Sequence, residues 1–259
     1  MRFDVITLFP EMFRVLAEFG ITRRAHEQGR WSLRTWNPRD FTSDAHRTVD
    51  DRPFGGGPGM VMLAEPLALA VEAASGDAAR TGAAGKVIAF APAGRPLTDA
   101  LVREWSTGSA LTLVCGRYEG IDQRFLDACV DQVVSIGDFV MSGGEIAAMA
   151  LIDAVVRQLP GALKEASTAD ESFAAGLVDG PHYTRPEQWR GRTVPAVLLS
   201  GHHAQITRWR REQALLATAR QRPELIEAAR RGNGLGVADE EFLRGVDAQM
   251  PDLAQGVRA

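Results

Sequence analysis

The sequence lacks the features that would place it among the common nucleotide-binding or metal-binding proteins. Its 259 residues contain neither G-x-G-x-x-G nor G-x-x-x-x-G-K-[S/T], the glycine patterns of dinucleotide and phosphate sites. Only two cysteines are present, Cys115 and Cys129, which are too few for a zinc site or a disulfide framework, so we expect buried thiols. His46, His202 and His203 have no Cys or carboxylate companions at metal-ligand spacing, and we predict no metal site.

Long apolar runs are also missing. No stretch of about 18 apolar residues without charge occurs in the chain. The first residues, MRFDVITLFPEMF, have a strand pattern and lack the basic and apolar regions of a signal peptide. We therefore expect no membrane segment and a cytoplasmic location.

The net charge is small, −4 at pH 7, but it is unevenly distributed. Residues 181–231 contain ten Arg, no Lys and four Glu, so this segment is clearly positive within an acidic chain. Such a segment is typical of a local contact with a polyanion such as nucleic acid. The alternative, a solvated arginine-rich face, stays open on composition alone.

Short apolar runs alternate with helical patterns in the first part of the chain and predict an α/β domain with a parallel sheet. We expect strands at the runs FDVITLF, WSLRTW, KVIAFAP, ALTLVCG and DQVVSIGD, which begin at residues 3, 31, 86, 110 and 131. Helical patterns cover residues 10–29, 97–106, 122–130 and 144–163.

The alternation of strands and helices stops after this region, which predicts a second domain. We assign residues 1–162 to the α/β domain, 163–179 to a polar connector, and 180–259 to a small helical domain that carries the arginines. Its helices are expected at 202–221 and 223–232, separated at a proline.

Three turns that contain glycine follow predicted strands, at the strand ends where open α/β sheets bind ligands. They are APAGRP (91–96), CGRYEG (115–120) and SIGDFVMSGGE (135–145). Glycine lets a ligand approach backbone N–H groups closely, and no phosphate-loop lysine accompanies these turns. They favour a nucleoside held by backbone contacts, although each alone could be a tight strand-to-helix connection. A fourth segment, VDDRPFGGGPGM (49–60), must be a loop that lines a site or only connects.

These segments and several others resemble one family, the bacterial tRNA (guanine-N1)-methyltransferases. The matching segments are ITLFPEMF (6–13), RDFTSDAHRTVDDRPFGGGPGM (39–60), VCGRYEGID (114–122), SIGDFVMSGGE (135–145), ALIDAVVRQLPG (150–161), GPHYTRPE (180–187) and VPAVLLSGHHAQITRWR (194–210). Each segment is modestly specific, but the ordered set is highly specific and covers nearly the whole chain except its last part.

The resemblance implies a SPOUT-type α/β domain with a parallel sheet and a deep trefoil knot, followed by a small, mostly helical domain that binds tRNA. It implies S-adenosylmethionine as the cofactor, bound within the knot, with magnesium as a possible aid. The family is an obligate homodimer with active sites shared between subunits. Its reaction is methylation of N1 of the guanosine immediately 3′ of the anticodon, which maintains the reading frame.

Carried over position by position, the resemblance implies a cofactor site built from the three turns. Its residues are Pro92 from the first turn, Gly116, Tyr118, Glu119 and Gly120 from the second, and Ser135, Ile136, Gly137, Asp138, Phe139, Val140, Met141, Gly143 and Gly144 from the third. Phe139 and Met141 stand where the family often has Tyr and Leu, and both changes keep an apolar wall.

The implied reaction requires a base, because N1 of guanine carries a proton at neutral pH. The family has an acidic pair before Ser-Phe in the connector, and here this pair is Asp170–Glu171, the reverse of the usual Glu-Asp order. Glu171 stands at the position of the base, with Asp170 as the alternative, since the two residue types have similar intrinsic pKa values. Arg157 matches the arginine that stabilises negative charge on O6, although a helix-end arginine favoured by the macrodipole would look the same.

The remaining implied residues contact RNA. Asp50 and Ser167 match positions near the target guanosine, and His182, Arg185 and Arg208 match positions in the tRNA-binding domain. Two alternatives stand beside the methyltransferase. One is an RNA-binding protein of this fold that has lost catalysis, which only the reversed acidic pair supports. The other is a methyltransferase that acts on another RNA.

Overall fold

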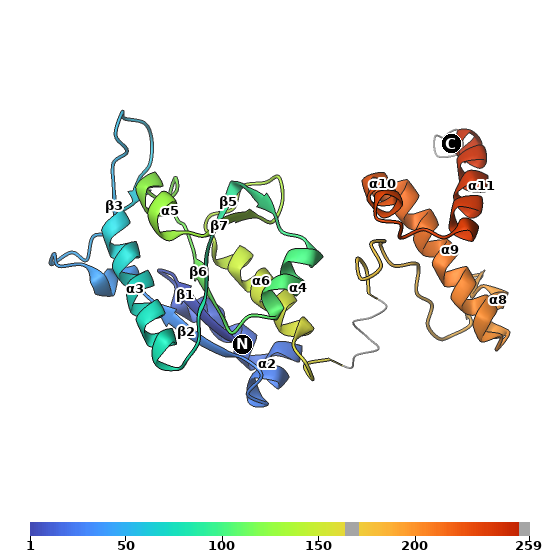
Figure 1. The fold of residues 1–259 in the computed structure, drawn as a ribbon, viewed down its shortest axis with the longest axis horizontal. Coiled ribbons are helices and arrows are strands. Elements are labelled where there is room, and N and C mark those ends of the chain that lie inside the picture. Colours follow the sequence, from blue (N-terminus) through green and yellow to red (C-terminus); the bar gives the residue numbers. More distant parts are fainter. Residues whose placement is uncertain (164–170, 254–259) are drawn as a thin grey trace. The chain divides into compact units, whose positions relative to one another are not determined.

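The structure, a computed structural model, describes residues 1–163 and 171–253, of which the last seven are described by their backbone alone. The chain divides into two compact units, Met1–Glu165 and Ala166–Ala259. Figure 1 shows that strands and helices alternate in the first unit and that helices dominate the second.

The first unit is built around a five-stranded, entirely parallel sheet with the order β2-β1-β6-β5-β7. Its strands are β1 (Arg2–Ile6), β2 (Ser32–Trp36), β5 (Gly85–Pro96), β6 (Ala110–Val114) and β7 (Gln132–Ser135). Every residue of β1 and β6 is buried. Burial explains the apolar run of β6, whereas β1 also buries two charged residues, Arg2 and Asp4, which pair with each other. The predicted α/β fold with a parallel sheet is confirmed.

Helices cover both faces of this sheet (Figure 1). They are α2 (Gly20–Glu27), α3 (Ala64–Arg80), α4 (Asp99–Ser106), α5 (Gln123–Cys129) and α6 (Glu145–Gln158). Phe3 and Val5 belong to the apolar core formed with α4 and α6, whereas Ile6 belongs to the core formed with α3 and α5. Neighbouring residues of β1 therefore face opposite layers, as the pleat of a strand requires.

Two helical parts of the first unit differ from the sequence predictions. The pattern over 10–29 forms η1 (Pro10–Phe13), α1 (Arg14–Glu18) and α2 rather than one helix. The break occurs because Phe19 is extended and Gly20 takes a left-handed φ of 67°. The sequence analysis also missed α3, although its buried residues have the spacing of one helix face: Pro66, Leu67, Ala70, Val71, Ala74 and Ala78.

The glycine-rich segment at 49–60 is a loop, as predicted. The short helix η2 (Pro38–Phe41) precedes it, and the two-residue strands β3 (Asp50–Asp51) and β4 (Val61–Met62) pair at its base. Four of its glycines take positive φ angles, from 78° to 125°. Phe54 at this loop is 99% exposed, so the loop presents an apolar ring to solvent.

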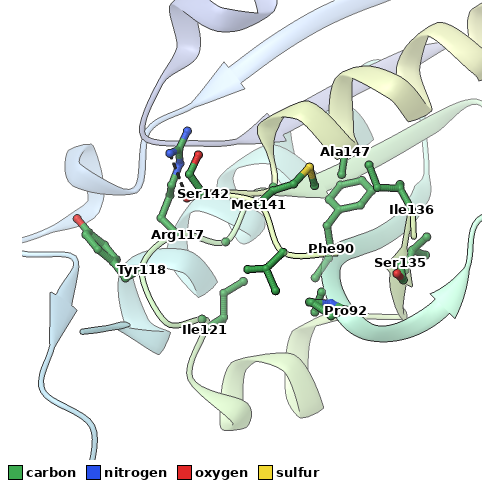
Figure 2. Close-up of a pocket in the computed structure, with 18 of the residues that line it drawn as sticks. Phe90, Pro92, Arg117, Tyr118, Ile121, Ser135, Ile136, Met141, Ser142 and Ala147 are labelled. Atoms are coloured by element: carbon green, nitrogen blue, oxygen red, sulfur yellow. Dashed lines mark hydrogen bonds between the residues drawn. The ribbon is translucent and has the colours of Figure 1, made fainter. Parts of the chain in front are cut away.

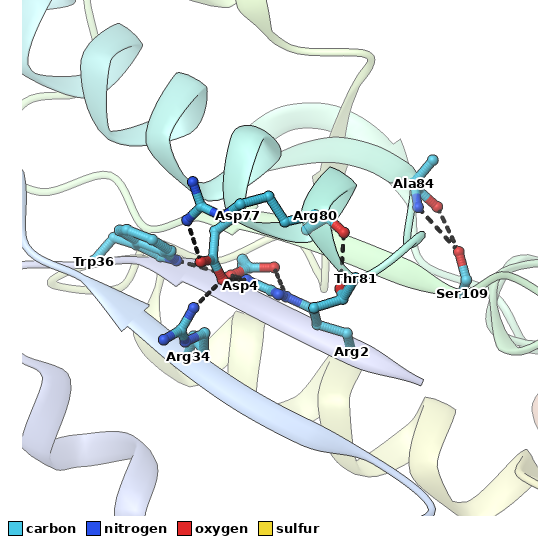
Figure 3. A network of polar contacts seen from close by, with 10 residues as sticks. Arg2, Asp4, Arg34, Trp36, Asp77, Arg80, Thr81, Ala84 and Ser109 are labelled. Carbon is cyan, nitrogen blue, oxygen red and sulfur yellow. Dashed lines mark hydrogen bonds and ion pairs between the residues drawn. The ribbon is translucent and has the colours of Figure 1, made fainter.

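A network of charges links α3 to β1 and β2 (Figure 3). The carboxylate of Asp77 contacts Arg2 at 2.7 Å and Arg80 at 2.6 Å, and it also pairs with Arg34. Arg2 in turn donates two hydrogen bonds to Asp4, at 2.6 and 2.7 Å. These bonds raise the pKa of the Arg2 guanidinium. The buried charges are therefore all paired, as charges out of water need to be.

Replacing Asp77 with alanine is expected to lower the free energy of unfolding by about 2–3 kcal/mol, because Arg2 loses a partner in a nearly dry site, whereas Arg34 is 55% exposed and adds little. Urea unfolding followed by circular dichroism measures this change. Arg80→Ala is the matched control: this side chain contacts the same carboxylate but is 74% exposed, so its loss is expected to cost about 1 kcal/mol or less. Equal effects of the two substitutions would contradict this view of the network.

The second unit has a small apolar core. Its elements are β8 (Gln188–Trp189), β9 (Arg192–Thr193), α8 (Ala196–Leu199), α9 (His203–Gln221), α10 (Pro223–Arg231) and α11 (Val237–Leu253). The two predicted helices are present as α9 and α10, whereas α11 was not predicted. The apolar core of the second unit consists of Leu177, Leu215, Ile226 and Leu243, all of which are buried.

The remaining expectations concern single residues and absences. Cys115 is buried, and this burial raises the pKa of its thiol, while Cys129 is half-buried at the end of α5; neither forms a disulfide. Within residues 1–163 and 171–253, no helix has the length and apolar character needed to cross a bilayer. In the same described residues, no cluster of three His, Cys, Asp or Glu side chains could hold a metal ion.

Candidate functional site

The three predicted glycine turns meet around one cavity of about 360 Å³ in the first unit (Figure 2). Residues 89–92 belong to β5, residues 116–121 follow β6, and the lining residues between 134 and 144 come from the end of β7 and the turn after it. The strands are parallel, so their carboxyl ends share one edge of the sheet. The fold therefore explains why turns far apart in sequence line the same space.

All predicted cofactor residues except Asp138 line this cavity. Asp138 belongs to the third turn but is not among the lining residues. Sequence reasoning missed further residues of the wall: Ala89, Phe90, Ala91, Arg117, Ile121, Leu126, Val134, Ser142 and Ala147. Most of these are apolar residues of strands and helices, which a sequence pattern marks as core. The structure shows a shared cavity, and the binding of a cofactor there stays a prediction.

A bulge in β5 brings the first turn to the cavity. The pairing of β5 with β7 shifts its register, so that Phe90 and Arg95 both stand opposite Val134. The residues between them leave the ladder, and Pro92 reaches the wall of the cavity. At Gly94 a Cβ atom would lie 2.5 Å from the backbone of Val134, so only glycine fits there.

The second and third turns are joined directly. The N–H of Gly144 donates a hydrogen bond of 2.9 Å to the carbonyl of Gly116, and Arg117 forms an antiparallel bridge with Gly143. A Cβ atom on Gly144 would lie 2.9 Å from the Cα atom of Cys115. The glycines therefore let two backbone segments approach more closely than residues with side chains would.

A buried ion pair lies behind these two turns, and the sequence analysis did not assign it a role. Nε of Arg117 lies 2.9 Å from Oε2 of Glu145, whose side chain is only 1% exposed. The hydroxyl of Thr7 donates to the other carboxylate oxygen at 2.9 Å. Arg117 also donates to the carbonyl of Ser142 at 3.2 Å, and its guanidinium stacks over Phe9 at 4.4 Å. One side chain thus ties the second turn to the third turn and to the N-terminal segment.

The wall of the cavity is largely apolar. Phe90, Ile136, Met141 and Ala147 gather on one side in Figure 2. The polar group among them, the hydroxyl of Ser135, is occupied by the adjacent turn, since it donates to the carbonyl of Gly137 at 3.0 Å. Such a wall suits a flat, weakly charged ring that uses backbone groups for its polar contacts.

Polar residues lie at the other end of the cavity. Tyr118 has a left-handed φ of 59° and is 47% exposed. Partial burial and a hydrogen bond with Asp50 raise the pKa of its phenol, while Arg39 acts in the opposite direction. Asp50, predicted to contact substrate, therefore lies next to Tyr118, a predicted cofactor residue.

The glycine-rich loop also reaches this end of the cavity. The N–H of Glu119 donates to the carbonyl of Met60 at 2.9 Å. A Cβ atom on Gly59 would lie 2.3 Å from Oε1 of Glu119, so Gly59 makes room for that carboxylate. The loop at 49–60 is therefore more than a connector, because it packs against a residue that lines the cavity.

The predicted catalytic residues are placed only in part. Arg157 lies in the last turn of α6, where the helix dipole favours a cation. Glu171 belongs to the second unit and lines a cavity of about 450 Å³ there, together with His182 and Trp209. Asp170 and Ser167 lie outside the described residues.

The residues predicted to bind RNA differ in their availability. Arg208 is engaged within the second unit, by Glu212 at 2.7 Å and by Asp239 at 3.3 Å. His182 contacts Asp179 at 3.0 Å. Arg185 is exposed and lines a groove of about 630 Å³. The structure thus brings Arg208 into a fold-stabilising cluster; the spacing of four residues indicates its pair with Glu212, but no local pattern indicates its contact with Asp239.

Comparison of the whole sequence with known proteins gives one family. Residues 1–228 match the protein family described as tRNA (Guanine-1)-methyltransferase TrmD. Three similar proteins are each named tRNA (guanine-N(1)-)-methyltransferase. The one from Ralstonia nicotianae is 62% identical over 244 residues, covering 94% of this chain and 92% of the relative. The one from Janthinobacterium sp. is 59% identical over 245 residues, covering 94% and 98%. The one from Burkholderia multivorans is 57% identical over 256 residues, covering 98% and 97%. This chain therefore belongs to the tRNA (guanine-1)-methyltransferase family.

Proposed function

We propose that this chain methylates N1 of a guanine in tRNA, at the guanosine immediately 3′ of the anticodon, with S-adenosylmethionine as the methyl donor. The match of residues 1–228 to the family carries the proposal. The sulfonium of the donor supplies an activated methyl group when bound. The alignment of the two substrates, the removal of the N1 proton and the stabilisation of developing charge are left to the protein.

The cavity of the first unit fits such a donor. Its volume of about 360 Å³ falls in the range of ligand pockets, about 300–1,000 Å³. Its apolar wall of Phe90, Ile136 and Met141 suits an adenine ring. Gly116 and Gly144 line the cavity without side chains, so a ligand can approach the backbone closely at both positions.

The chemistry requires one carboxylate and one cation. We propose Glu171 as the base that takes the proton from N1, with Asp170 as the alternative. Negative charge then develops on O6 of the guanine, and we propose that the guanidinium of Arg157 stabilises it. The family resemblance supports these roles. Asp50, Ser167, His182 and Arg185 are proposed to contact the RNA on the same basis.

We also propose the finer family features for the first unit. A deep trefoil knot is supported by the match of residues 1–228 to the family. A homodimer with shared active sites is supported by exposed apolar side chains beside the cavity, at Val140 and on α6 at Ile146, which are 86% and 51% exposed. A cytoplasmic location follows from the tRNA substrate.

The proposed function is tested by methyl transfer from labelled S-adenosylmethionine to two unmodified tRNA transcripts. One carries guanosine at the last anticodon position and at the next, and the other has the target guanosine replaced by adenosine. We expect label only in the first, recovered as 1-methylguanosine after digestion. Parallel reactions with magnesium and with EDTA show whether the metal assists the reaction. Binding of both substrates without transfer would instead favour an RNA-binding protein that has lost catalysis.

A further inference from the structure

The second unit contains a hairpin whose side chains have no role in its core. β8 and β9 pair antiparallel, with Gln188 opposite Thr193 and Trp189 opposite Arg192. The two residues of the turn, Arg190 and Gly191, take φ angles of 47° and 77°. Positive φ at both positions is the geometry of the tightest hairpins. The hairpin therefore ends in a tight two-residue turn, its tip, and all four of its strand residues are exposed.

The tip presents an aromatic ring. Trp189 is 57% exposed, although tryptophan is a residue that folded proteins usually bury in large part. The guanidinium of Arg190 lies 5.0 Å from the centre of its ring. Arg192 stands directly across the ladder from Trp189, so both side chains belong to the same face of the hairpin. The hairpin thus combines one flat ring with two guanidinium groups.

The positive charge of this region is available to a ligand. Among the described residues, Arg185, Arg190 and Arg192 form no ion pair with a carboxylate. Arg208 and Arg211 differ, because both contact Asp239. Carboxylates therefore neutralise part of the positive charge of α9, whereas the arginines of the hairpin region keep their full charge.

A groove adjoins the hairpin within the same unit. It has a volume of about 630 Å³ and is lined by Glu187 and Val194, the residues that flank the hairpin. Tyr183 and Trp209 also line it, with ring centres 6.2 Å apart, and Arg210 contributes a further cation. Aromatic rings interspersed with unpaired arginines are typical of surfaces that bind single-stranded RNA, where bases stack and phosphates pair with guanidinium groups.

We propose that the β8–β9 hairpin contacts the tRNA substrate, with an unpaired nucleobase stacked on Trp189 and neighbouring phosphates held by Arg190 and Arg192. This inference rests on the proposed function, because it takes tRNA as the partner. It goes beyond the family resemblance, which assigned no residue of the hairpin. Stacking accounts for an exposed indole, and phosphates account for two guanidinium groups without carboxylate partners.

The test measures tRNA affinity, the salt dependence of binding and methyl transfer for variants of the full chain. Trp189→Ala is expected to weaken tRNA binding about 5- to 150-fold, the range that loss of one stacked base produces, with S-adenosylmethionine affinity unchanged. Trp189→Phe keeps a ring and is expected to retain most of the affinity. The double substitution Arg190→Gln and Arg192→Gln is expected to reduce the slope of log K against log salt concentration by about 1.4.

The double substitution Arg220→Gln and Arg231→Gln is the matched control, since both side chains are exposed on α9 and α10 and their replacement removes the same two charges from another part of the unit. It is expected to change the salt slope little. If the wild-type chain methylates tRNA while Trp189→Ala binds it normally, the hairpin proposal is overturned and the proposed function stands. If Trp189→Ala changes the oligomeric state but not tRNA affinity, the hairpin is a protein contact and the proposal also fails. A wild-type chain that neither binds nor methylates tRNA would overturn the proposed function itself.

Discussion

Replacing Glu171 with alanine is expected to reduce the rate of methyl transfer by about 10²–10⁴-fold, the contribution of a positioned general base. The reason is chemical, because N1 of guanine is not nucleophilic until its proton is removed. Affinity for S-adenosylmethionine is expected to stay nearly unchanged, since the candidate cofactor cavity is lined by other residues. Single-turnover methyl transfer and calorimetric binding of S-adenosylmethionine measure the two quantities separately.

The matched control for this substitution is Asp170→Ala, at the other position of the acidic pair. It removes the same charge from the neighbouring residue and is expected to leave most of the rate intact. Glu171→Gln keeps the size of the side chain and is expected to be as inactive as the alanine variant. Full activity of Glu171→Ala together with an inactive Asp170→Ala would assign the base to Asp170 instead.

Much of the fold follows from local patterns in the sequence. The apolar run of β6 and the alternating pattern of β1 both favour strands, and both strands are buried throughout. The helix pattern over 10–29 failed because periodicity does not report the backbone of Gly20, whose left-handed φ separates two helices. α3 was overlooked because it follows a glycine-rich loop, although the positions on its buried face are helically spaced.

Part of the candidate site could also be predicted from local sequence patterns, and part could not. Glycine turns after strands are visible in a sequence, and the parallel sheet then brings their ends to one edge, so the cavity could be predicted. Contacts between residues that are far apart in the sequence could not be predicted in this way. Thr7 and Glu145 are 138 positions apart, and Arg208 meets Asp239 across 31 positions. Nothing in the local pattern around Arg208 shows that an acidic residue of α11 neutralises it.

The ion pair between Arg117 and Glu145 is expected to contribute strongly to both stability and cofactor binding. Glu145→Ala is expected to lower the free energy of unfolding by about 3 kcal/mol. This is the low end of the range for a broken buried pair, because Arg117 is 18% exposed and keeps its contacts with Ser142 and Phe9. Thr7 also loses the acceptor of its hydroxyl hydrogen bond. Urea unfolding of the variant measures the total change.

The same substitution is expected to weaken S-adenosylmethionine binding about tenfold, because the turns at 116–120 and 142–144 lose a tie that holds them in place before a ligand arrives. Calorimetric titration measures this effect.

Glu104→Ala is the matched control, since its pair with Lys86 has a similar distance of 2.9 Å but both side chains are about half exposed. It is expected to cost about 1 kcal/mol or less and to leave cofactor affinity unchanged. A Glu145→Ala variant that loses stability but binds S-adenosylmethionine normally would show that the pair supports the fold alone. Loss of both properties would show that the pair also preorganises the turns that line the cavity.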